Sequence, residues 1–133
     1  MKRTNISSGA KWEDIVGYSR AVRIGNIIEI SGTAPVDGDK VFGIGDAYAQ
    51  TKFCLQKIEK ALIEAGSSMN DVIRTRMFVT DISLWEDYGR AHREYFLKIK
   101  PVTSMVEVKS LIDPDMLIEI EATAIILNNE KQE

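Results

Sequence analysis

The sequence contains very little cysteine and histidine and no long apolar run, and each shortage excludes a class of protein. Cys54 is the single cysteine, so the chain forms no internal disulfide and no zinc site built on cysteines. His92 is the single histidine, which excludes a metal site with two histidine ligands. No apolar run approaches the roughly 20 residues of a membrane span, and no signal-peptide core is present. We therefore expect a cytoplasmic protein that has no contact with a membrane and needs neither a metal nor a cofactor.

The charge balance and the length are those of an ordinary globular domain. The chain has 133 residues, which corresponds to one domain at roughly 150 residues per domain. Its 17 Lys and Arg residues stand against 20 Asp and Glu residues, for a net charge of −3. A net negative charge does not attract phosphate backbones at long range, so nucleic acid is not an expected partner. We expect a single domain over residues 1–127 and a polar C-terminal tail over residues 128–133.

Hydrophobic periodicity predicts an α+β domain in the order β-β-α-β-α-β-β, with two helices packed on one face of a mixed sheet. Asp46 has the character of a helix N-cap, and Gly66 of the residue that ends the same helix. Ser83 and Glu86 have the spacing of a capping box ahead of the second helix. The predicted strands are Ser19–Ile24, Ile27–Ser31, Val72–Thr80, Thr103–Lys109 and Leu117–Leu127.

Alternation within these strands predicts one apolar face and one polar face. The helices would cover the apolar face. The polar face is either solvated or an interface between copies of the chain, and alternation alone does not decide between the two. The apolar set comprises Ile28, Ile30, Ile73, Met77, Val79, Val106, Val108, Ile118, Ile120, Ala122 and Ala124. The polar-face set comprises Glu29, Ser31, Arg74, Arg76, Thr103, Met105, Glu107, Glu119 and Glu121.

Few residues suggest chemistry by themselves. Glu119 and Glu121 point to the same side of one strand and can raise each other's pKa, which suits an acid/base pair but also an ordinary surface strand. Cys54 is expected to be a buried, inert thiol. His92 is expected to be solvated or partly packed on the second helix.

Three stretches carry a resemblance to a known family. They are Arg23–Val36 with its Ser31-Gly32-Thr33 motif, Asp71–Asp81, and Pro101–Val108 followed by Ile118–Ala122. Their order and spacing, over residues 3 to 127, resemble those of the RidA/YjgF (reactive intermediate deaminase) family. The resemblance implies a chorismate-mutase-like fold and a homotrimer with clefts for small-molecule metabolites between its subunits. It also implies hydrolysis of enamines and imines derived from amino acids to keto acids and ammonia.

The resemblance assigns roles to individual residues. Tyr18 matches the family's pocket tyrosine, and Glu119 matches the glutamate that positions water. These two residues are the expected catalytic pair. Ser31 matches the serine of the S-G motif, and Ser31 and Thr33 are expected to contact substrate.

The chain departs from the family pattern at positions that matter for substrate binding. Thr103 stands where deaminating members carry the arginine that binds the substrate carboxylate. Met105 stands at the following cysteine position, and Gly89 at the position of an asparagine on the second helix. We therefore expect weak standard deaminase activity. The alternatives are a non-catalytic small-molecule binder or regulator and, disfavoured by the net charge, an endoribonuclease or translation inhibitor.

Arg20 is a candidate replacement for the missing arginine. Tyr18 and Arg20 are two residues apart on a predicted strand, so their side chains are expected on the same side of the sheet. Arg20 would then bind an anionic group of the ligand. The competing interpretation is a salt bridge between Arg20 and Glu29 or another glutamate of that face.

Overall fold

A computed structural model describes residues 1–127, and the predicted tail, 128–133, lies outside the described residues. The strands of its main sheet are β1 (Arg3–Ile6), β2 (Ala21–Ile24), β3 (Ile27–Thr33), β6 (Val72–Val79), β7 (Val102–Glu107) and β8 (Ile118–Ile125). They lie in the order β1-β2-β3-β8-β6-β7, and all neighbours are antiparallel except β6 and β7. The α+β fold with a mixed sheet is confirmed.

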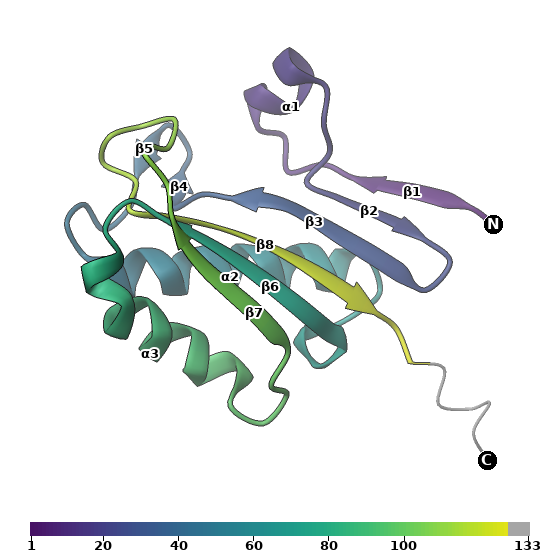
Figure 1. Ribbon diagram of the computed structural model, residues 1–133. Helices are drawn as coiled ribbons and strands as arrows, with labels where there is room; N and C mark the ends of the chain where they lie inside the picture. Colours follow the sequence, from purple (N-terminus) through teal and green to yellow (C-terminus); the bar gives the residue numbers. More distant parts are fainter. Residues whose placement is uncertain (128–133) are drawn as a thin grey trace.

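Helices and short turns complete the structure. Figure 1 shows α2 and α3 on the same side of the sheet, with α1 beside the β1–β2 end. The prediction missed β1 and α1, because elements this short have too few turns or alternations to give a periodic signal. The remaining elements are α1 (Lys11–Val16), β4 (Val36–Asp37), β5 (Lys40–Val41), α2 (Ala47–Glu64), η1 (Met69–Asp71), η2 (Ile82–Leu84) and α3 (Trp85–Phe96).

The longest helix, α2, forms where the sequence predicts it. The Asp46 carboxylate accepts from the backbone N–H of Ala49 at 3.0 Å, which caps the helix. Gly66 follows the helix with a φ of 87°, in the left-handed region that favours glycine. The predicted stripe is buried beneath the sheet, so α2 supplies one side of the core; its members are Thr51, Leu55, Ile58, Leu62 and Ala65.

The start of α3 differs from the prediction. The turn η2 precedes the helix, and Ser83 lies inside that turn rather than ahead of the helix. Asp81 is the capping residue, because its carboxylate accepts from the Ser83 N–H at 3.0 Å and from the Ser83 hydroxyl at 2.6 Å. The capping box of Ser83 and Glu86 was therefore wrong. The carboxylate that caps η2 belongs to Asp81, the residue immediately before this turn.

A register shift in β6 corrects the predicted apolar face. The pairing of β6 with β8 slips between Val72 and Arg74, so one extra residue separates them. Val72 and Thr75 consequently both face the core, and Ile73 is left 46% exposed. The placement of Ile73 on the core face was wrong.

The edge strand β7 is turned over relative to the prediction. In its parallel pairing with β6, Thr103 lies beside Thr75 and Met105 beside Met77. Thr75 and Met77 belong to the buried face, so Thr103 and Met105 lie on the helix side and not on the polar face. Val106 lies on the opposite side and is 46% exposed. An edge strand touches one neighbour only, and its alternation alone does not tell which face is covered.

None of the helices within residues 1–127 is both long and apolar enough to cross a membrane.

Candidate functional site

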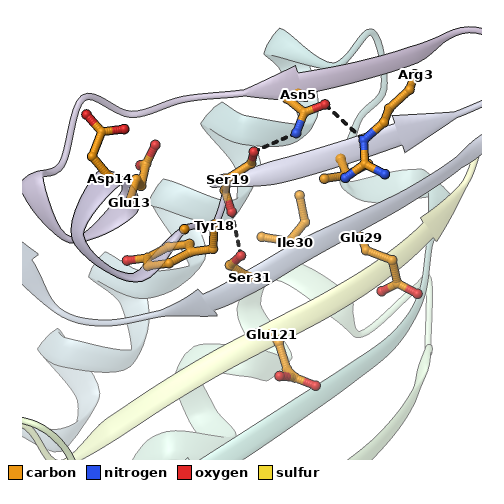
Figure 2. Close-up of a pocket in the computed structure, with 12 residues that line it drawn as sticks. Arg3, Asn5, Glu13, Asp14, Tyr18, Ser19, Glu29, Ile30, Ser31 and Glu121 are labelled. Carbon is orange, nitrogen blue, oxygen red and sulfur yellow. Dashed lines mark hydrogen bonds between the residues drawn. The ribbon is translucent and has the colours of Figure 1, made fainter.

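A cavity of about 680 Å³ opens beside α1 at the β1–β2–β3 end of the sheet (Figure 2). Tyr18 and Ser31, two of the predicted site residues, line it. Glu29 and Glu121 also line it, from strand positions that alternate with buried ones and therefore lie on the side away from α2 and α3. The cavity therefore lies on the face of the sheet that points away from α2 and α3, the open face.

Tyr18 reaches the cavity from the end of α1. Gly17, with a φ of 92°, ends that helix, and the N–H groups of Gly17 and Tyr18 both donate to the Glu13 carbonyl, at 2.8 and 2.9 Å. The Glu13 carboxylate accepts from the Ser7 hydroxyl at 2.8 Å, which holds the preceding loop against the helix. Tyr18 therefore lies in a fixed turn before β2, and not on the strand where the sequence placed it, with 37% of its surface exposed.

Ser31 is held by a strand-to-strand contact. Its hydroxyl donates to the Ser19 carbonyl at 2.6 Å, so its oxygen remains free to accept a further hydrogen bond (Figure 2). The Ser19 hydroxyl in turn accepts from the Asn5 side chain at 2.8 Å. Thr33 is fully buried and donates to the Ser31 carbonyl at 2.8 Å. Of these two motif residues, only Ser31 faces the cavity.

Glu119 occupies space that only a glycine leaves open. A Cβ atom on Gly32 would collide with the Glu119 carboxylate, whose oxygen Oε2 lies where that atom would stand. Gly32 does not need a left-handed φ, so the close approach is its reason for being glycine. Burial raises the pKa of Glu119, the positive charge of Arg20 acts against that rise, and Glu121 adds to it. The carboxyl group of Glu119 is thus able to hold a proton at a higher pH than an exposed glutamate.

Arg20 binds the backbone beneath this site. The guanidinium donates from Nη2 to the Gly32 carbonyl at 2.7 Å, its Nε has no partner, and the residue is 8% exposed. Within the single chain Arg20 does not line the cavity. Glu29 accepts instead from the Thr123 hydroxyl, at 2.6 Å. The geometry therefore matches neither an open cation in the cavity nor a salt bridge with Glu29.

The remaining predicted residues lie in a second group at the other edge of the sheet. Thr103 and Met105 belong to β7, on the helix side, and Gly89 belongs to α3. A Cβ atom on Gly89 would meet nothing within 4 Å. Glu119, by contrast, pairs across the sheet with Phe78 on the open face. One chain therefore does not bring the two groups of predicted site residues together.

His92 connects the second group to the core. Its Nε2 lies 2.8 Å from the Thr75 hydroxyl, which donates to the Thr103 hydroxyl at 2.7 Å. Burial lowers the pKa of His92 to about 4, so the ring is neutral at pH 7. Sequence reasoning gave His92 no such role. Its position three residues after Gly89, on the same helix face, was the available signal.

Two other sequence expectations concern reactive side chains. Cys54 is fully buried, and burial raises the pKa of its thiol, as expected of an inert cysteine. Within residues 1–127, no group of three or more His, Cys, Asp or Glu side chains is arranged to hold a metal ion. The cavity presents a phenol from Tyr18, a hydroxyl from Ser31 and four carboxylates, whereas Glu119 is not among its lining residues in the single chain; the carboxylates are those of Glu13, Asp14, Glu29 and Glu121.

Comparison with known families and curated proteins gives consistent matches. The sequence profile described as Endoribonuclease L-PSP matches residues 9–126. The 3-aminoacrylate deaminase RutC of Acinetobacter baylyi is 38% identical over 111 residues, covering 80% of this chain and 85% of that protein. Uncharacterized protein SCO2049 of Streptomyces coelicolor is 36% identical over 119 residues, covering 90% of this chain and 89% of that protein.

Solved structures agree with these matches. Rv2704 of Mycobacterium tuberculosis, described as a member of the YjgF/YER057c/UK114 family, has a TM-score of 0.84 and 50% identity, covering 94% of this chain and all of that one. The yjgF gene product of E. coli has a TM-score of 0.78 and 28% identity, covering 92% of this chain and 94% of that one.

Proposed function

The chain belongs to the Endoribonuclease L-PSP family, which is the RidA/YjgF group, and we propose that it hydrolyses the C–N bond of small enamines or imines. The proposal rests on the environment of the Glu119 carboxyl group, whose pKa is raised by burial and which occupies the space beside Gly32 that a Cβ atom would fill. A carboxyl group with a raised pKa takes a proton from water and returns it to a leaving nitrogen more readily than an exposed one. The relative named as a deaminase supports the same chemistry.

The proposed reaction begins with water and an imine carbon. Glu119 accepts a proton from the water as the water oxygen bonds to that carbon, and it passes this proton to the imine nitrogen, which gives a carbinolamine. Glu119 then takes the hydroxyl proton of the carbinolamine and delivers it to the same nitrogen, so that the C–N bond breaks, ammonia leaves and the carbonyl group forms. Tyr18, fixed by the end of α1, supplies a phenol for orienting the reacting nitrogen, and the free lone pairs of Ser31 accept from the N–H.

We place this reaction in clefts between three copies of the chain. Two features support the assembly. The groups around Glu119 and Thr103 lie on opposite faces in one chain, so a cleft that contains both needs a second copy. The open face also exposes Val102 and Val106, which are 56% and 46% accessible. Light scattering on a gel-filtration peak should give about three times the chain mass of 14.9 kDa, whereas a monomer at micromolar concentration contradicts the proposal.

The test of the activity is a trapping assay. Imines with and without a free carboxylate, 2-aminoacrylate among the former, are generated in the cuvette, semicarbazide traps each imine, and added protein suppresses the trapped product if it hydrolyses that imine. Suppression with 2-aminoacrylate should be weak, because Thr103 stands in place of the arginine that would bind its carboxylate. Glu119→Gln should abolish the suppression, and Glu86→Gln, an exposed glutamate of α3, is the matched control that should retain it. No suppression by the wild-type protein with any imine contradicts the proposal.

Non-catalytic binding of a small metabolite is the second candidate function. Thr103 favours it, because a hydroxyl offers no charge with which to hold a substrate carboxylate. Saturable binding of a keto acid or amide without release of ammonia from any imine would support this candidate. RNA is a poorer ligand for the cavity, since Glu13, Asp14, Glu29 and Glu121 line it against the single guanidinium of Arg3.

A further inference from the structure

The hydrogen-bonded chain from His92 through Thr75 to Thr103 has no part in the chemistry described so far. It joins three elements: His92 on α3, Thr75 on the buried face of β6, and Thr103 on the edge strand β7. Thr75 is fully buried, whereas Thr103 is exposed. The chain therefore runs from the interior to an accessible hydroxyl.

The direction of the chain depends on the tautomer of the His92 ring, because each threonine hydroxyl has a single hydrogen to donate. In one of the two possible directions, Thr75 donates its hydrogen to Thr103. The Thr75 oxygen can then only accept from His92, which requires the neutral ring tautomer with its hydrogen on Nε2. The Thr103 oxygen is occupied by the Thr75 donor, and its own hydrogen is free. In this direction, Thr103 is presented outward as a donor.

The surroundings of Thr103 suit an uncharged group. The side chain beside it on β7, Met105, is apolar and packs partly against the core. Space is open at Gly89, one helical turn before His92. Within residues 1–127, the Thr103 hydroxyl has one hydrogen-bond partner, Thr75. No residue of β7 forms a salt bridge in this part of the chain. The Thr103 hydroxyl offers a carboxylate no charge that would offset the hydration lost on binding.

We propose that His92 and Thr75 are positioning residues that present the Thr103 hydroxyl as a hydrogen-bond donor to an uncharged carbonyl group, such as an amide or ester, of the ligand. The inference rests on the proposed cleft and deepens it by naming the substrate class. The protein would then act on, or bind, compounds in which the amino-acid carboxylate is masked. A single donor and an apolar neighbour recognise a neutral carbonyl, whereas a free carboxylate requires charge as well.

The test compares two probes that share one carbon skeleton, pyruvate and its uncharged amide, pyruvamide. At pH 7.5, calorimetry on the wild-type protein should show pyruvamide binding about 10-fold more tightly than pyruvate, which corresponds to about 1.4 kcal/mol. Thr75→Val keeps the shape of the side chain and the Thr103 hydroxyl but breaks the chain, and it should reduce this preference to about 2-fold or less. Thr51→Val, at an equally buried threonine of α2, is the matched control and should retain the preference.

A second readout reports on the chain directly. Nitrogen chemical shifts of the His92 ring should identify the tautomer protonated at Nε2 in the wild-type and Thr51→Val proteins, and should change in Thr75→Val. The inference is overturned by equal or tighter binding of pyruvate, by saturation with neither probe, by an Nδ1-protonated ring, or by an unchanged preference in a folded Thr75→Val protein. Amide preference without turnover of any imine would contradict the proposed hydrolysis alone. Turnover without amide preference would contradict this inference alone.

Discussion

Acid should destabilise this protein through His92 more than through any exposed group. Burial lowers the pKa of His92 to about 4 in the folded chain, whereas an unfolded histidine titrates near its ordinary value of 6.5. Above pH 6.5 both states are neutral at this residue and its contribution is nil. As the pH falls from 6.5 towards 4, the unfolded state binds a proton that the folded state does not, so stability is lost; below 4 both states bind it and the loss stops growing.

The magnitude follows from the two proton affinities. At about 1.4 kcal/mol for each tenfold difference in proton affinity, lowering the pH from 7.5 to 4.5 costs at most about 2.5 kcal/mol of unfolding free energy. The value is an upper limit because the ring keeps some contact with solvent. In a domain of this size a change of that order shifts the thermal midpoint by several degrees.

Urea unfolding at pH 7.5 and 4.5 measures the effect, with wild-type and His92→Gln proteins at the same concentration. Glutamine can still reach the Thr75 hydroxyl but does not titrate, so the difference between the two pH-dependent losses isolates His92. Protein concentration is held constant because assembly would contribute to the measured stability. Equal losses in both proteins, or a histidine ring that titrates near pH 6.5 by NMR, would refute the reasoning.

Three further predictions concern single side chains. Gly32→Ala should displace the Glu119 carboxylate and abolish imine hydrolysis, while the urea midpoint changes little because a flexible side chain can move; retained activity would contradict the role given to this contact. Gly89→Ala should stabilise the protein by about 0.5–1 kcal/mol in urea unfolding, because alanine loses less backbone entropy in a helix and meets open space here; destabilisation would show that the space is needed. Asp46→Ala should lower the unfolding free energy by about 1 kcal/mol, because it removes the carboxylate that caps the Ala49 N–H. An unchanged midpoint in urea unfolding would contradict this prediction.

Local signals in the sequence determined most of the secondary structure. Asp46, the buried stripe of α2 and Gly66 are all within one helix, so their meaning does not depend on distant residues. The hairpin at Gly25 is equally local: Gly25 has a φ of 59°, and Ile24 pairs with Ile27 across the two-residue turn. The family resemblance, which the comparisons confirm, then supplied the fold as a whole.

Tertiary structure alone decided how the candidate site is divided. The slip in β6 and the parallel pairing of β7 set which side chains of these strands face the helices, and neither is visible in a strand's own alternation. The surroundings of Thr103 are one consequence of this pairing. The sequence indicated that this position differs from the family pattern, but its hydrogen bond to Thr75, and through it to His92, exists only because α3, β6 and β7 pack together. Residues 75, 92 and 103 are far apart in the chain, and only the packing of the folded domain brings their polar atoms within hydrogen-bonding distance.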